Sequence, residues 1–169
     1  MRIAAIVTGQ LRDYRVNVQN HIKHLIEASD ADVFVYACSK NTIHTLGDNI
    51  TQKYNITTSV SSNNLTEEIG KIYGDNLKGI YIDENENLSA DDFGTLGYFK
   101  RKMNNQMGNI RKGFLMAKEY ATENSFEYDI IIRLRPDNSH FPLPVDVRSS
   151  GLTDGTIYST VYPSGHRDP

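Results

Sequence analysis

The first forty residues hold two apolar runs with an amphipathic stretch between them. Residues Arg2–Thr8 form the first run, which Gly9 ends, and Val33–Cys38 form the second. Between them, apolar residues recur at a helical spacing, at Val16, Val18, Ile22, Leu25 and Ile26. This strand–helix–strand order predicts two parallel strands. Their uninterrupted apolar character is typical of strands that are covered on both faces.

A polar stretch separates this unit from the rest of the chain. Residues Ser39–Tyr73 are harder to assign, with Asn55–Val60 as a candidate short strand and Thr66–Tyr73 as a candidate short helix. The next strand is expected over Leu77–Asp83, through Ile80 and Ile82. The alternation of strands and helices therefore continues beyond the first unit.

The clearest helix and the clearest strand come next. A stripe of apolar residues at spacings of three and four predicts a helix over about Gly97–Glu123. Its members are Phe99, Met103, Met107, Ile110, Phe114, Ala117 and Ala121. Residues Tyr128–Arg135 give the strongest strand signal, and Thr156–Val161 are expected to form a last strand.

The 169 residues fit one domain. We predict a single three-layer α/β domain over residues 1–169, with a mostly parallel central sheet. The sequence stops at Pro169 with no closing helix after the last expected strand, which leaves truncation at the C-terminus open.

Charge and cysteine content exclude several classes of function. A formal net charge of -3 provides no basic field for a nucleic-acid backbone, so no nucleic-acid partner is expected. Cys38 is the one cysteine, which excludes an intrachain disulfide and a cysteine-rich zinc site. The N-terminal apolar run is too short for a membrane span or a secretory segment. We therefore expect a cytoplasmic protein with no membrane span.

The turn after the first strand is the first candidate binding site. In open α/β sheets, ligands bind outside the carboxyl ends of the strands. Gly9 allows a ligand to approach the main chain, Gln10 offers a donor and an acceptor to a base or ribose, and Arg12 offers a fork of donors for phosphate. Neither a GxGxxG fingerprint nor a Walker loop is present. A plain strand-to-helix turn is the alternative.

The end of the strand over Tyr128–Arg135 carries the second candidate site. Side chains alternate along a strand, so Arg133 and Arg135 share one face. A buried, unpaired charge is costly, so these groups must reach solvent, a carboxylate or an anionic ligand. Asp137 follows at the carboxyl edge, where a carboxylate can hold a divalent cation or a ribose hydroxyl. Structural ion pairs of the arginines with Asp129, Asp137 or Glu127 are the alternative.

The long helix offers a third group of candidates. Gln106, Asn109 and Gly113 form a small and polar stripe beside the apolar one. If this stripe faces the carboxyl edge of the sheet, Gln106 and Asn109 would contact a bound sugar. Ordinary exposure to solvent is the alternative.

Three segments resemble a loose group of bacterial and viral glycosyltransferases of polysaccharide synthesis. They are Arg2–Arg12, Ala31–Tyr36 and the block from Gln106 through Tyr128–Asp137. The resemblance implies a GT-A-like, Rossmann-like fold that binds a nucleotide-sugar. It also implies an enzyme that moves a sugar from a nucleoside diphosphate sugar donor to a saccharide acceptor.

In the glycosyltransferase hypothesis, the two strand ends hold the donor. The residues assigned to it are Gly9, Gln10, Arg12, Arg133, Arg135 and Asp137. Arg135 and Asp137 would stabilise charge on the leaving diphosphate, and Gln106 and Asn109 would orient the sugar. A non-catalytic nucleotide-binding or interaction domain is the alternative, and the absence of a Gly-rich phosphate loop disfavours a nucleotidyltransferase.

The resemblance departs from the GT-A pattern at the metal site. The strand that ends at Asp137 would take the place of the DxD strand of GT-A enzymes, but Arg135 stands where the first Asp is expected. Mn²⁺ or Mg²⁺, with Asp137 as a ligand, is therefore a candidate cofactor rather than a requirement, since Arg135 could itself neutralise the diphosphate.

Overall fold

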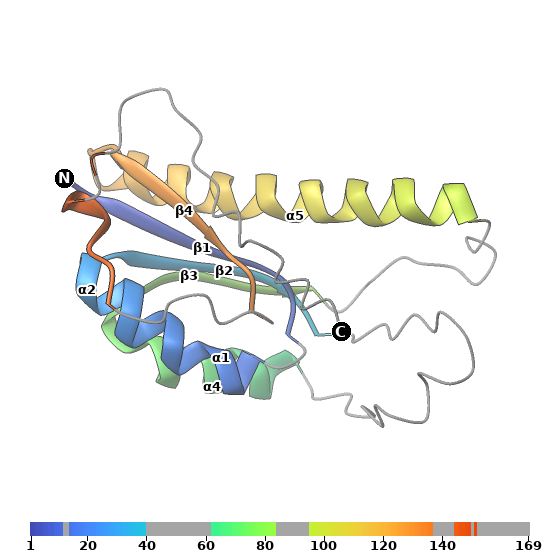
Figure 1. Ribbon diagram of the computed structural model, residues 1–169, viewed down its shortest axis with the longest axis horizontal. Coiled ribbons are helices and arrows are strands. Elements are labelled where there is room, and N and C mark those ends of the chain that lie inside the picture. The colour runs from blue at the N-terminus through green and yellow to red at the C-terminus, as the bar shows by residue number, and fades with distance from the viewer. Residues whose placement is uncertain (12–13, 40–61, 84–94, 137–143, 150, 152–169) are drawn as a thin grey trace, which may run out of the picture.

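The protein contains a sheet of four parallel strands with helices on both faces (Figure 1). The computed structural model describes residues 1–11, 14–39, 62–83, 95–136, 144–149 and 151, and the side chains of 62–63 and 95–105 lie outside that description. The strands are β1 (Ile3–Gln10), β2 (Asp32–Cys38), β3 (Leu77–Asp83) and β4 (Ile130–Leu134). Their order is β3-β2-β1-β4. The prediction of an α/β domain with a parallel sheet is confirmed.

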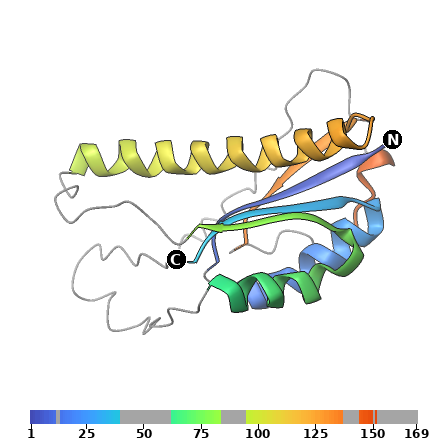
Figure 2. The ribbon, with the colours of Figure 1, turned by 180° about the vertical axis from the view of Figure 1, so that it is seen from behind.

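Helices from two parts of the chain cover the two faces of the sheet (Figures 1 and 2). On one face lie α1 (Tyr14–His21), the π-helical η1 (Ile22–Ile26), α2 (Glu27–Ser29) and α4 (Ser62–Tyr73). On the other lies α5 (Thr95–Glu123). Two short 3₁₀ helices, η2 (Gly74–Asn76) and η4 (Val147–Ser149), complete the described elements. None of the described helices combines the length and the apolar character needed to cross a lipid bilayer.

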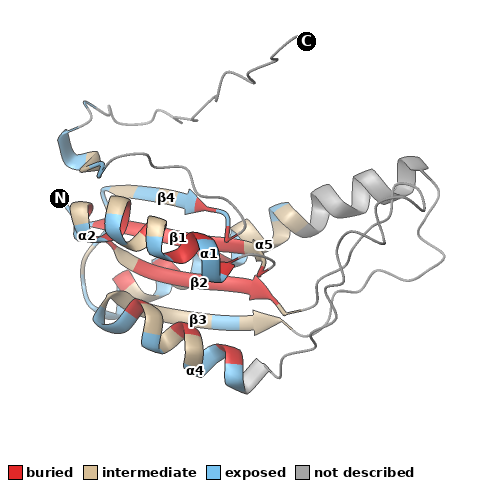
Figure 3. Cartoon of the chain, turned by 60° about the horizontal axis from the view of Figure 1, so that its bottom comes forward, coloured by how far each residue is buried: buried red, intermediate tan, exposed pale blue. Residues whose placement is uncertain are grey.

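The apolar runs form strands because the sheet buries them. The central strands β1 and β2 are buried along most of their length, whereas the edge strands β3 and β4 are partly exposed (Figure 3). The larger core cluster lies between the sheet and the helices α1 and α4. The smaller cluster, centred on Ala4, Phe34 and Ala117, lies beneath α5. The three layers therefore enclose two cores, one on each face of the sheet.

The small residues of α5 face the sheet, which corrects part of the predicted apolar stripe. Met107 and Phe114 belong to that stripe, but they are 56% and 41% exposed. Ala117 and Ala121 of the same stripe are buried as predicted, and so is Gly113, which was assigned to the neighbouring polar stripe. A Cβ built at Gly113 would overlap Ile6 Cγ2, so the missing side chain is what lets α5 lie close to β1.

Some element boundaries differ from the predicted ones. β1 continues through Gln10, because Gly9 and Gln10 pair with Ala37 and Cys38 of β2. α4 begins at Ser62, before the expected start at Thr66. The strands expected over 55–60 and 156–161 lie outside the described residues.

Candidate functional site

The order of strands reverses between β1 and β4. From β1 the chain passes through α1 to β2 and then to β3, and α5 carries it back across the other face to β4. Adjacent strands whose connections run on opposite faces form a switch point, and ligands of open α/β sheets bind there, outside the carboxyl ends. The two strand ends predicted from the sequence, at Gly9–Gln10 and at Arg133–Arg135, flank this point.

The opening turn and the end of β4 touch each other. Gly9 has a φ of 137°, a conformation that residues with a side chain rarely adopt. A Cβ built at Gly9 would lie 3.4 Å from Pro136 Cδ, which directly follows Arg135. Thr8 is buried, and its Oγ1 accepts a long hydrogen bond of 3.4 Å from Arg133 Nε. The structure therefore brings the two predicted segments together.

Both arginines lie on the face of the sheet that α5 covers. Leu134 belongs to the core cluster on the opposite face, so the alternation of side chains places Arg133 and Arg135 on the α5 side. Arg133 is the register partner of Ile6, and both arginines are exposed. This location lets the guanidinium groups remain charged in water or meet an anion.

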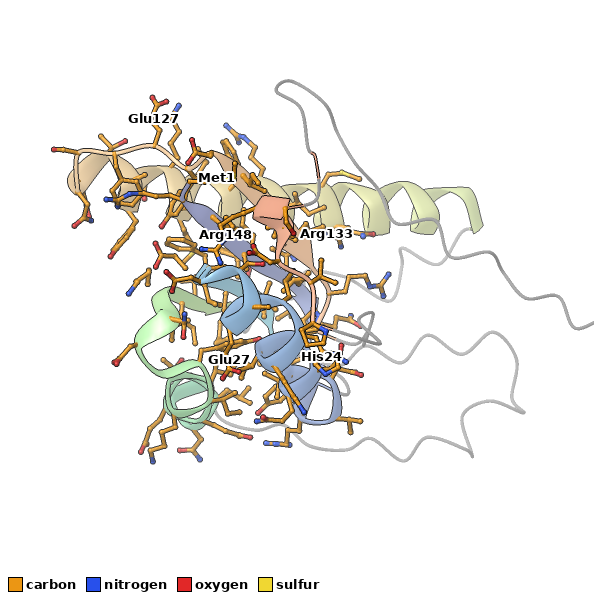
Figure 4. All side chains as sticks on the ribbon, turned by 60° about the vertical axis from the view of Figure 1, so that its left-hand side comes forward. Met1, His24, Glu27, Glu127, Arg133 and Arg148 are labelled. Atoms are coloured by element: carbon orange, nitrogen blue, oxygen red, sulfur yellow. The ribbon has the colours of Figure 1, made fainter. Side chains whose placement is uncertain are left out.

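Two of the carboxylates considered as structural partners are directed elsewhere. Asp129 Oδ2 accepts a hydrogen bond of 2.6 Å from the backbone N–H of Arg2, at the amino end of the sheet. Glu127 precedes β4, and Figure 4 shows it away from Arg133. The third, Asp137, lies outside the described residues, as does Arg12. Their predicted roles stay predictions.

Asn17 supports the end of β4, although no sequence pattern singled it out. Its side chain is buried, and Nδ2 donates a hydrogen bond of 3.5 Å to the carbonyl oxygen of Pro136. Helix α1 thereby helps to hold the backbone that connects Arg135 to Asp137. The sequence held no signal for this role, because only the structure shows that Asn17 shares the buried face of α1 with Tyr14 and His21.

The segment after β4 returns to the helices on the same face as Asn17. Val145 N donates to the carbonyl oxygen of His24 at 2.6 Å, and Ser29 Oγ donates to the carbonyl oxygen of Val145 at 3.0 Å. Arg148 extends this contact by donating to the carbonyl oxygen of Ala28 at 3.3 Å. Figure 4 shows Arg148 and His24 on these neighbouring segments.

Helix α5 overhangs the carboxyl edge of the sheet. It begins beyond the strand ends and runs back over the sheet (Figures 1 and 2). Asn109 and Gln106 precede Gly113 by one and two turns, on the same side of the helix, and both are half-buried. Their stripe therefore faces the sheet and leads toward its carboxyl edge, as their predicted role requires. Contact with a sugar stays a prediction.

A metal centre has little support among the described residues. They contain no group of three or more His, Cys, Asp and Glu side chains that could hold a metal ion. The candidate ligand Asp137 lies outside them. A divalent cation therefore stays a prediction, and the described cations of the site are arginines.

Comparison with known proteins adds no family to this description. No protein-family model, curated protein or solved structure matches this chain. Its class rests on the fold alone, which is an α/β domain with a four-stranded parallel sheet and a switch point between β1 and β4.

Proposed function

We propose that this domain is a GT-A-like glycosyltransferase. It would bind a nucleoside diphosphate sugar and transfer the sugar to a saccharide acceptor. The observation that carries the proposal is the contact between the Gly9 turn and the end of β4, with two exposed arginines beside it. It lies at the switch point of a parallel sheet, where nucleotide ligands bind in folds of this architecture.

The nucleoside would lie on the β1 side of the switch point. Gly9, with its positive φ, would let the turn bring its main chain toward the ligand, and Gln10 follows it with an amide that can both donate and accept. Arg12 would complete this side by donating to a phosphate. Gln106 and Asn109, on the overhanging α5, would orient the sugar.

The diphosphate would lie on the β4 side. A hydrogen bond from a guanidinium to a phosphate oxygen contributes about 1.5–3 kcal/mol. Arg133 and Arg135 would make such bonds and stabilise the charge that develops on the diphosphate as the sugar leaves. Asp137 would bind a ribose hydroxyl or a divalent cation, which would supply further positive charge. Because Arg135 replaces the first Asp of the DxD pattern, we propose that binding does not depend on a metal.

A thermal-shift screen of UDP, GDP, ADP and CDP, with and without Mn²⁺, tests this proposal. A ligand at a hundred times its Kd adds about 2.7 kcal/mol to the free energy of unfolding. We expect one nucleoside diphosphate to raise the Tm of the wild type and of Arg111→Ala, which removes an exposed arginine of α5. Arg135→Ala should lose the shift and keep the Tm of the unliganded protein. An unchanged shift in Arg135→Ala would place the site elsewhere.

Release of nucleoside diphosphate separates the enzyme from a binding module. The assay uses the sugar conjugates of whichever nucleoside diphosphate binds. Slow release from one of them, lost in Arg135→Ala, supports glycosyl transfer. Tight binding of every conjugate without release favours the non-catalytic alternative.

A further inference from the structure

An aromatic pair lies on the side of α5 that is nearer to β3. Tyr36 of β2 and Tyr81 of β3 are register partners, and their rings stack with centroids 5.0 Å apart and planes 19° apart. Tyr36 is buried under α5, where a Cβ built at Gly113 would lie 3.6 Å from the Cβ of Tyr36. Tyr81 is 52% exposed. The buried ring thus supports an exposed one.

The open face of Tyr81 points away from Tyr36. Within the described part of the chain, β3 is an edge strand, so no further strand covers the outer side of Tyr81. Tyr36 covers the inner side. The result is a rigid, flat and partly apolar surface at the edge of the sheet.

Two charged groups flank this surface. Lys112 Nζ donates a hydrogen bond of 2.9 Å to Tyr36 Oη. This hydrogen bond is the main cause of a raised pKa of Lys112, and the nearby charge of Asp83 raises the pKa further. The ammonium is therefore charged at neutral pH. Asp83 ends β3 two residues after Tyr81, on the same face of the strand.

This combination matches the chemistry of a sugar ring. A pyranose presents a face of C–H bonds, which can stack on an aromatic ring, and a rim of hydroxyls. The hydroxyls can donate to the carboxylate of Asp83 and accept from the ammonium of Lys112. An aromatic surface with a few convergent polar groups is the usual composition of a small-molecule site.

We propose that Tyr81, Lys112 and Asp83 form a saccharide-binding subsite that holds the acceptor. The role as an acceptor site rests on the proposed glycosyl transfer, whereas the binding of a saccharide does not. β3 lies two strands from β1, about 10 Å at the usual strand spacing, and both strands end at the same edge. A saccharide stacked on the open face of Tyr81 lies outside β3, so it would have to extend along the carboxyl edge, past Asp83, to reach the donor side.

Saturation-transfer difference NMR tests the subsite directly. The probes are lactose, cellobiose and N,N′-diacetylchitobiose, without nucleotide. We expect transfer from the protein to the ring C–H protons of at least one of them. Tyr81→Phe keeps the aromatic face and should keep the signal, whereas Tyr81→Ala should weaken binding about tenfold or more. Phe114→Ala is the matched control, because Phe114 is a 41% exposed aromatic residue of α5 that does not belong to the proposed subsite.

Nucleotide binding by the same proteins distinguishes this subsite from the donor site. Tyr81→Ala should keep the thermal shift with the nucleoside diphosphate, and Arg135→Ala should keep the saccharide signal. Equal saccharide signals in the wild type and Tyr81→Ala would overturn the subsite, and so would no signal from any of the three probes. Loss of nucleotide binding in Tyr81→Ala would also overturn it, because the ring would then stack on a base.

Discussion

Gly113 determines how closely α5 packs on the sheet. A Cβ at this position would overlap Ile6 Cγ2 and lie 3.0 Å from Thr8 Cγ2. Both neighbours belong to the buried strand β1, which cannot move without disturbing its pairing with β2 and β4. The absence of one side chain thus fixes the distance between two layers.

Gly113→Ala should therefore destabilise the protein, although alanine is the better helix former. Overpacking a close interface costs about 1–3 kcal/mol, which exceeds the gain in helix propensity of about 1 kcal/mol. Gly108→Ala is the control, because no heavy atom lies within 4 Å of a Cβ built at Gly108. It should raise the free energy of unfolding by about 0.4–1 kcal/mol. Urea denaturation measures the free energy of unfolding of both variants. We expect Gly113→Ala to lower it and Gly108→Ala to raise it, and equal stabilisation by both would contradict the close packing.

At the candidate site, the sequence predicted which residues carry functional chemistry but not which residues contact one another. Gly9 and the two arginines could be singled out because their residue types are unusual at the ends of apolar strands. Thr8 and Asn17 could not, since a threonine in a strand and an asparagine in a helix are unremarkable until the fold brings them against Arg133 and Pro136. Contacts between residues so distant in the chain depend on strand order, which local patterns do not contain.

At the scale of elements, an ion pair on the surface joins α1 to α4. Arg15 Nε and Nη2 donate to the two carboxylate oxygens of Glu68 at 2.6 and 2.8 Å. The hydrogen bonds from Arg15 are the main cause that lowers the pKa of Glu68 from 4.5 to about 2. The side chains of Arg15 and Glu68 are 57% and 33% exposed, so solvent screens the pair and it contributes about 1 kcal/mol or less.

Stability should therefore decrease in acid through Glu68. Its pKa is lower in the folded state, so its contribution is fully present above pH 4.5 and is lost as the pH falls toward about 2. The difference in unfolding free energy between the wild type and Glu68→Gln should narrow as the pH falls from about 5 to 3. Glu67→Gln is the control, because Glu67 pairs with Lys71 within α4 and joins no second element. A difference that stays constant with pH would contradict the bridge.

The sequence predicted elements well where burial is complete and less well where it is partial. The central strands β1 and β2 are mainly apolar, and helices cover both of their faces. The apolar stripe of α5 predicted that Phe114 faces the sheet. Gly113 packs against β1 instead, so the side of α5 that carries Gly113 is closest to the sheet and Phe114 stays partly exposed. Apolar periodicity reports the average environment of a helix face, and a single glycine can shift which side packs closest.

For the whole molecule, the order of strands was the information the sequence lacked. Each crossover predicted a parallel pair, but no local pattern says that α5 crosses the opposite face and places β4 beside β1. That choice brings the two arginines to the turn at Gly9 rather than to the far edge of the sheet. The candidate site is therefore a property of the topology as much as of the residues.

The charge of the whole molecule opposes an anionic ligand, whereas the site attracts it. A formal net charge of -3 acting across about 20 Å of water repels each ligand charge by only about 0.6 kcal/mol before screening. One guanidinium about 4 Å away, at an effective dielectric constant near 20, attracts it by about 4 kcal/mol. The local attraction dominates, so added salt should weaken binding of the nucleoside diphosphate rather than strengthen it.

We accordingly expect the Kd of the nucleoside diphosphate to rise between about 0.05 and 0.5 M NaCl, as the screening length falls well below 10 Å. Isothermal titration calorimetry measures Kd at each salt concentration, and hence the slope of log Kd against the logarithm of the salt concentration. Arg135→Ala should bind more weakly and show a shallower slope, because one of the charges that salt screens is gone. The nucleoside without phosphates serves as the control and should show little dependence on salt. Were the diphosphate to bind more tightly at high salt, its recognition would be apolar and the two arginines would not form the site.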